Sequence, residues 1–191
     1  MNVKKMNDNI VTRKWKERYS SLSDEIRAKI DNLEESKPKD YLFKKNKSNK
    51  DYPDVGTVFE LVTPQNIVVY GIVVNNHIDS ALGNDLLTVI ILNPDIDMSK
   101  NEAKIDCSSN MFIPPLIIST ELWKKGFAKN ICKTNFSVND DYSFYDVVFG
   151  KFFSDNGENS VEKKVIGIYG ISTVFGVSKQ VQKELIIQGL V

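Results

Sequence analysis

Apolar runs dominate the chain after residue 53, and their spacing predicts a β-rich fold. The stretch from Pro53 to Val74 holds two runs rich in Val, Ile, Phe and Tyr, separated by a break at residues 63–66. β-Branched and aromatic residues favour strands, whereas Pro, Gly and Asn favour the turns between them. The stretch therefore predicts a β-hairpin that opens a β domain.

Further apolar runs predict the rest of the sheet. Residues 86–92, LLTVIIL, are apolar on both faces, which is typical of a central strand covered on both sides. Pro114 and Pro115 lack an amide hydrogen, so their end of the run must lie at a sheet edge or outside the ladder. Gly167 and Gly170 interrupt the last run and predict a close approach of the backbone there. The other strands are predicted at residues 55–62, 67–75, 103–107, 113–118, 127–132, 142–153 and 164–172.

Apolar residues spaced by three and four positions predict helices in the first and last segments. Between residues 12 and 35 this spacing is interrupted by serines at 20, 21 and 23, which can cap free amides. Two short helices are therefore predicted, at 12–20 and 23–35. A capped helical turn is predicted at 119–126, where Gly126 can end it, and a longer helix from Thr173 or Ser178 to Gln188.

These elements predict a mainly β (α+β) fold. We expect a bent sheet or a partly open SH3-like β-barrel, with an N-terminal helical pair and a C-terminal helix. Residues 1–50 form a helical segment and basic linker, and residues 51–191 form the β-rich domain. Residues 36–54 are rich in lysine and poor in apolar side chains, so they are expected to be a linker or mobile loop.

Charge is distributed unevenly along a chain whose net charge is zero. Residues 1–50 contain 14 basic and 8 acidic side chains, a net charge of +6, and they include all three arginines; residues 51–191 carry −6. A basic arm can contact nucleic acid, although a solvated helix and linker explain the same charges. The acidic remainder suits a basic protein partner.

The composition also bears on location. No apolar run approaches the ~20 residues that a membrane-spanning helix needs, and the first residues lack the apolar core of a secretory signal. The two cysteines, Cys107 and Cys132, do not form a Cys-x-x-Cys motif. We therefore predict a cytoplasmic protein without membrane contact, in which both cysteines are reduced and buried as small apolar side chains.

The chain has little of the chemistry that enzymes use. His77 is the single histidine, and Asp95 and Asp97 are one of several acidic pairs in turn-like settings. Turn formation explains such pairs, although a cation site at Asp95 and Asp97 and a pairing of His77 with a cysteine stay open as alternatives. No phosphate-binding or nucleophile motif occurs. We predict no enzymatic activity, no metal and no other cofactor.

One family pattern matches the opening hairpin. Residues 54–61, DVGTVFEL, followed by residues 70–74, YGIVV, resemble the bacterial immunity protein 26 family. The chain departs from that pattern at Thr57, where the family has Asp, and at Ile72, where it has a basic residue. The resemblance implies a protein that neutralises a cognate toxin of a polymorphic toxin system by binding it, and it implies no catalytic residues.

The same hairpin is similar to MazF/PemK-type endoribonucleases, which are small SH3-like barrels. In those proteins an Arg-Pro pair follows the first turn and helps to bind the RNA backbone. Here residues 68–71, VVYG, stand in that region, and no arginine follows residue 27. A MazF/PemK-like endoribonuclease or a nucleic-acid-binding β-barrel module, using the basic residues 1–50, is thus the alternative function.

Acidic loop residues are the predicted contacts for a basic toxin. Trp123 joins them because aromatic residues are enriched in binding hot spots, although its place on a one-turn helix beside Pro115 favours a core position at the end of the barrel. The candidate partner-binding residues are Asp79, Asp85, Asp95, Asp97, Asp140, Asp141 and Trp123.

Overall fold

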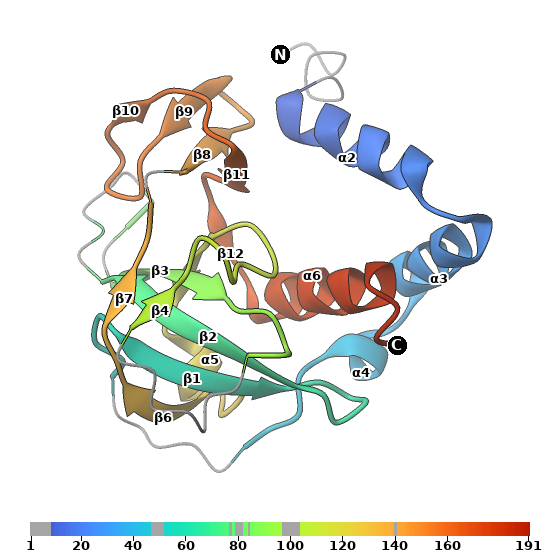
Figure 1. The fold of residues 1–191 in the computed structure, drawn as a ribbon, viewed down its shortest axis with the longest axis horizontal. Helices are drawn as coiled ribbons and strands as arrows, with labels where there is room; N and C mark the ends of the chain where they lie inside the picture. Colours follow the sequence, from blue (N-terminus) through green and yellow to red (C-terminus); the bar gives the residue numbers. More distant parts are fainter. Residues whose placement is uncertain are drawn as a thin grey trace.

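The structure is a computed structural model, and it describes residues 9–46, 52–76, 78, 82–83, 85–96, 104–139 and 141–191. Within these residues, the strands form a six-stranded sheet, a four-stranded sheet and a two-stranded ribbon, and the N-terminal and C-terminal helices lie along one side (Figure 1). The helices are α2 (Ile10–Ser21), α3 (Asp24–Glu35), α4 (Pro38–Tyr41), α5 (Glu121–Lys124) and α6 (Val174–Ile187).

The large sheet has the strand order β12-β5-β3-β2-β1-β6. All of its neighbours pair antiparallel except β12 and β5, which are parallel. The sheet is bent and does not close into a barrel, since β12 and β6 are its free edges. Its strands are β1 (Thr57–Val62), β2 (Val68–Asn75), β3 (Leu86–Ile91), β5 (Leu116–Ser119), β6 (Lys129–Lys133) and β12 (Ile171–Ser172).

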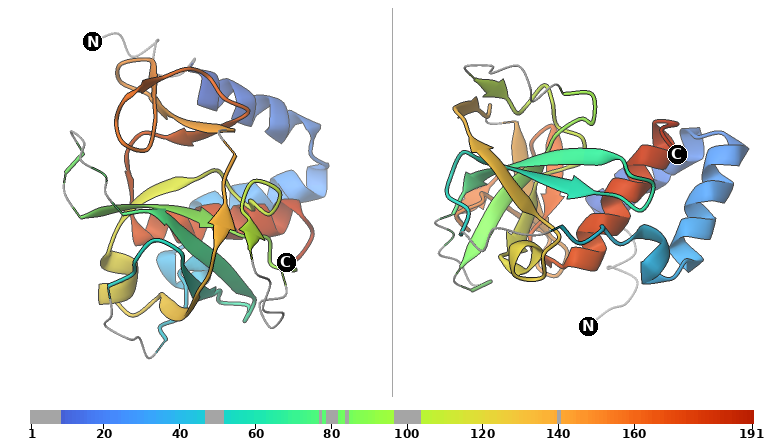
Figure 2. Two further views of the ribbon diagram at one scale, coloured as in Figure 1. Left: turned by 60° about the vertical axis from the view of Figure 1, so that its left-hand side comes forward. Right: turned by 90° about the horizontal axis from the view of Figure 1, so that it is seen from below.

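The small sheet lies above the large sheet, as Figure 1 and the left view of Figure 2 show. Its order is β10-β9-β8-β11, with β8 and β11 parallel. Its strands are β8 (Tyr142–Asp146), β9 (Lys151–Phe153), β10 (Asn159–Ser160) and β11 (Val165–Ile168). The ribbon pairs β4 (Ile105–Asp106) with β7 (Phe136–Ser137) in parallel.

Strand β3 is the centre of the core, as its apolar sequence predicts, because all six of its residues are buried. Leu87, Val89 and Ile91 face one side, where Val177 and Val181 of α6 pack on them. The intervening residues face the opposite side, where Ile90 and Leu92 pack with Ile105 and Cys107 of the ribbon. Helix α6 and the ribbon thus cover the two faces of the same sheet.

The fold class predicted from sequence is confirmed: the structure is α+β with a bent sheet, two N-terminal helices and the helix α6. Ser23 caps α3 by accepting a hydrogen bond from the amide of Ile26, and Thr173 caps α6. Gly126 has φ +78° at the end of the predicted helical turn. The backbone of Pro115 approaches Gly167 so closely that no Cβ would fit there.

Three expectations from sequence are corrected. The linker expected at residues 36–54 is structured through residue 46, because Tyr41 and Phe43 are buried and Lys44 bridges to β1. The run at 142–153 is two strands, β8 and β9, joined by a tight turn. The run at 164–172 divides as well, with β11 in the small sheet and β12 in the large one.

Glycine at position 71 is required by its cross-strand partner. Gly71 lies opposite Phe59 in the β1–β2 pair, and a Cβ at Gly71 would overlap the Phe59 ring. The Phe59 ring is fully buried and packs edge-on against Trp123, with their centroids 4.8 Å apart. The ring therefore has no room to move away from an added methyl group.

We predict that Gly71→Ala destabilises the protein by about 1–3 kcal/mol, because overpacking a full core forces side chains off their rotamers. Urea denaturation measures the change. Gly170→Ala is the matched control, since its Cβ would meet nothing closer than Ile168 at 3.8 Å. A loss at Gly170 as large as the loss at Gly71 would contradict the packing explanation.

Candidate functional site

The predicted acidic contacts do not form one patch among the described residues. Asp79, Asp97 and Asp140 lie outside the described residues, as does His77. Asp85 and Asp95 are exposed, but they lie at opposite ends of β3. The six residues of β3, which span about 20 Å, and three further residues separate them along the chain.

Asp141 and Trp123 also lie apart from those acids. Asp141 is half-buried at the start of β8, and its carbonyl accepts a hydrogen bond from the amide of Val165. Trp123 is only 4% exposed, and its indole N–H donates to Asn130 Oδ1 at 2.7 Å. Trp123 is therefore a core residue and offers no surface that a partner could cover.

One end of the small sheet gathers exposed apolar side chains. Strands β8, β10 and β11 all finish at this end, because β8 is parallel to β11 and both β8 and β10 are antiparallel to β9. Val148 and Phe149 follow β8 and are 54% and 72% exposed; Val161 follows β10 and is 65% exposed. Ile168 ends β11 and is 38% exposed. We call these four residues the apolar sheet end.

The turn that carries Val148 and Phe149 is held in one shape. Asp146 Oδ1 accepts hydrogen bonds from the amides of Val148 at 2.7 Å and Phe149 at 3.0 Å. The amide of Gly150 donates to the carbonyl of Asp146, and Gly150 adopts φ +68°, which a glycine does without strain. The two exposed side chains thus project from an ordered support.

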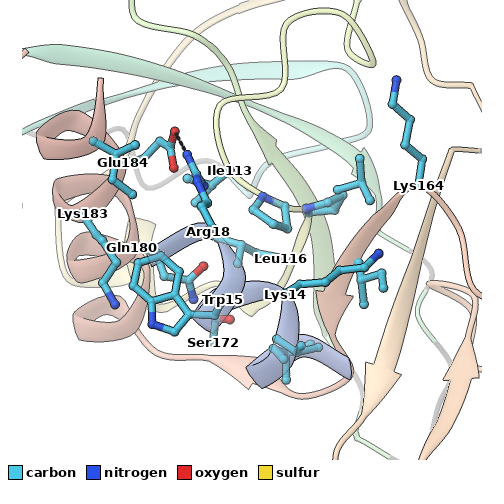
Figure 3. A pocket seen from close by; sticks show the side chains of 18 residues that line it. Lys14, Trp15, Arg18, Ile113, Leu116, Lys164, Ser172, Gln180, Lys183 and Glu184 are labelled. Carbon is cyan, nitrogen blue, oxygen red and sulfur yellow. Dashed lines mark hydrogen bonds and ion pairs between the residues drawn. The ribbon is translucent and has the colours of Figure 1, made fainter. Parts of the chain in front are cut away.

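A groove of about 460 Å³ lies beneath α2, between α6 and strands β5 and β11 (Figure 3). Its floor is mostly apolar, and basic side chains stand around it. The lining residues are Val11, Lys14, Trp15, Arg18, Ile113, Pro114, Pro115, Leu116, Lys164, Val165, Ile166, Gly167, Ile168, Ser172, Gln180, Lys183, Glu184 and Ile187. Ile168 belongs to both features, so the groove and the apolar sheet end share β11.

Polar contacts and partly buried apolar side chains together hold α2 above this groove. The helix has no fully buried residue, but Trp15 and Tyr19 pack against the apolar cluster that α3 and α6 form. Arg18 pairs with Glu184 at 2.7 Å, and Lys14 pairs with Glu162 at 3.1 Å. The Nζ atom of Lys183 sits 4.6 Å from the centroid of the Trp15 ring. Glu184 is the most buried of these charged groups, with its side chain only 8% exposed.

Helix α3 is attached more firmly. Ile30 and Leu33 pack with Ile186 of α6, and Lys179 and Lys183 both bind Glu34, at 2.8 and 2.5 Å. Partial burial acts to raise the pKa of Glu34, but the two lysine hydrogen bonds outweigh it and leave that pKa below its ordinary value. The α3–α6 pair is thus a fixed wall from which α2 extends.

The two cysteines differ, which corrects the expectation that both are buried. Cys107 is fully buried, and burial, with the nearby Asp106 carboxylate, raises the pKa of its thiol to about 12. Cys132 is exposed on β6. Both are free thiols.

The described residues lack a metal-binding cluster and a membrane-spanning helix. They contain no group of three or more His, Cys, Asp or Glu side chains placed to hold a metal ion. Nor do they include a helix long and apolar enough to cross a membrane.

Comparisons with protein-family models, with curated proteins and with solved structures found no match for this chain.

The apolar sheet end and the groove could be predicted from the sequence only in part. Asp146 and Gly150 are turn residues, but the apolar residues between them continue the strand pattern and hide the turn. The groove has no local signal, because its lining comes from four segments spread over residues 11–187.

We predict that Arg18→Ala destabilises the protein by about 1–2 kcal/mol, because it leaves the buried Glu184 carboxylate without its charged partner. Urea denaturation measures the loss. Arg27→Ala is the matched control, since Arg27 pairs with the exposed Asp24 within one helical turn and such pairs contribute about 0.3–0.5 kcal/mol. Equal losses in the two variants would show that burial of Glu184 does not matter.

We predict that a thiol reagent at pH 8 modifies one cysteine of the native protein rapidly and the second only after unfolding. Cys132 is exposed, whereas Cys107 is buried with a thiol pKa far above the pH of the assay, so it supplies almost no thiolate. Mass spectrometry of the labelled protein identifies the site. Rapid labelling of Cys107 in the folded protein would contradict its burial.

Proposed function

We propose that this chain is an immunity-type protein that neutralises a cognate bacterial toxin by direct binding in the cytoplasm. The observation that carries the proposal is the apolar sheet end, in which Val148, Phe149 and Val161 are each more than half exposed. The chain acts through its surface and needs no cofactor for this function. The resemblance of residues 54–74 to the immunity protein 26 family supports the same proposal.

The apolar sheet end has the properties of an interface centre. Aromatic anchors account for much of the binding energy in protein interfaces, and Phe149 is 72% exposed without a partner. A side chain that is already positioned loses little conformational entropy on binding. The hydrogen bonds of Asp146 to Val148 and Phe149 supply that positioning.

Charge elsewhere on the protein would favour a basic partner. Exposed acidic residues such as Asp85 and Asp95 are the predicted contacts for basic toxin side chains, and they act mainly on the rate of encounter. The apolar sheet end would then provide the buried centre.

Nucleic-acid binding through the basic residues 1–50, as in a MazF/PemK-like endoribonuclease, is the alternative. It would need free cations along α2. Lys14 and Arg18 already pair with Glu162 and Glu184, so two of the helix's cations are engaged within the protein. This alternative predicts RNA retention that falls steeply with salt.

We predict that Phe149→Ser and Val161→Ser each weaken binding to the toxin encoded at the neighbouring locus by about tenfold or more, the effect of removing a hot-spot side chain. Isothermal titration calorimetry with the purified toxin domain measures the affinity. Both side chains are exposed, so thermal unfolding of the variants should match that of the unmodified protein.

Ile131→Ser is the matched control, because Ile131 is 41% exposed on β6 at the far edge of the large sheet. Its affinity for the toxin should be unchanged. An absence of toxin binding by the unmodified protein would overturn the proposed function. Toxin binding that survives both variants would move the interface away from the apolar sheet end, and salt-sensitive RNA retention would favour the alternative.

A further inference from the structure

The groove beneath α2 has the size and composition of a small-ligand site. Its volume of about 460 Å³ falls within the 300–1,000 Å³ that is usual for such sites, which are mostly apolar with a few polar groups. Leu116 and Ile166 form part of the floor, and Ile187 of α6 and Trp15 of α2 stand on its sides. An occupant would therefore need a substantial apolar body.

The charged groups around this groove are mainly basic. Four of the lining residues are cations, Lys14, Arg18, Lys164 and Lys183, and one is an anion, Glu184. Arg18 and Glu184 neutralise each other, and Glu162 and Glu34, which are not part of the lining, pair with Lys14 and Lys183.

Of the four cations in the lining, Lys164 is the one that takes part in none of these ion pairs. It is exposed and directly precedes β11, and no partner for its ammonium group lies among the residues that the structure describes. Figure 3 shows Lys164 and Lys14 on one side of the groove, across from the Arg18–Glu184 pair. The excess positive charge therefore lies at one end of an apolar floor.

We propose that the groove binds a small organic anion with an apolar body, of the class of a medium-chain aliphatic carboxylate. The aliphatic part lies on Leu116 and Ile166 beside the Trp15 ring. The anionic head faces Lys164, the lysine of the lining that has no acidic partner among the described residues. An inorganic anion would leave the floor uncovered, and a neutral apolar molecule would leave the charge of Lys164 unmatched. This ligand site shares Ile168 with the apolar sheet end of the proposed function, but Val148, Phe149 and Val161 do not line it.

Isothermal titration calorimetry with decanoate, decanol and decylammonium tests the chemistry of the ligand. Decanoate should bind at one saturable site, and decanol and decylammonium should each bind about tenfold more weakly or worse, since they lack the charge-assisted contact. An absence of saturable decanoate binding overturns the proposal. Equal affinity for decanoate and decanol overturns its anionic part.

Variants test the position of the ligand. Lys164→Glu should weaken decanoate binding about tenfold and strengthen decylammonium binding. Lys124→Glu is the matched control, because Lys124 is exposed on α5 and does not line the groove. An equal loss in the two variants would show a general effect of net charge and would overturn the assigned site.

The two tryptophans give a second measure of position. Trp15 lines the groove and Trp123 is buried in the core, so decanoate should change the fluorescence of Trp15 alone. In Trp15→Phe the fluorescence change should disappear while calorimetry still detects decanoate. A fluorescence change that persists in Trp15→Phe would place the ligand elsewhere and overturn the site. Phe149→Ser should leave decanoate binding unchanged, which separates this test from that of toxin binding.

Discussion

Packing of α6 against the large sheet is the contact on which the other parts of the structure depend. Val177, Val181 and Leu185 cover one face of the sheet, and Ile186, on a neighbouring face of the helix, holds α3. A third face presents Glu184 to Arg18 of α2. One helix therefore closes the core, positions the N-terminal helices and forms a wall of the groove.

Local sequence predicts correctly the elements whose pattern of apolar residues follows from burial in the large sheet or against it. The central strand β3 is apolar on both faces, and it is buried on both. Short polar caps locate α3 and α6 correctly, because Ser23 and Thr173 bond free amides within their own first turns. The turn after Asp146 is missed, since the apolar residues that it exposes look like strand residues.

The candidate surfaces depend on strand pairings and tertiary contacts that local sequence does not determine. Residues 164–172 look like one strand, yet Gly170 separates β11 from β12 and sends them to different sheets. This division places Ile168 at the apolar sheet end and Ser172 in the groove. The sequence around Trp123 favours a core position over a surface anchor, and packing against Phe59 places it in the core.

The place of α6 in the chain also affects how the protein folds during synthesis. The ribosome makes α6 after every strand that it covers, so the apolar face formed by Leu87, Val89 and Ile91 has no cover while the strands emerge. Helix α3 is synthesised before all of these strands, and its packing partner Ile186 also becomes available only when α6 has been made. The nascent chain therefore carries an uncovered sheet face during translation, and the core closes in a late, long-range step.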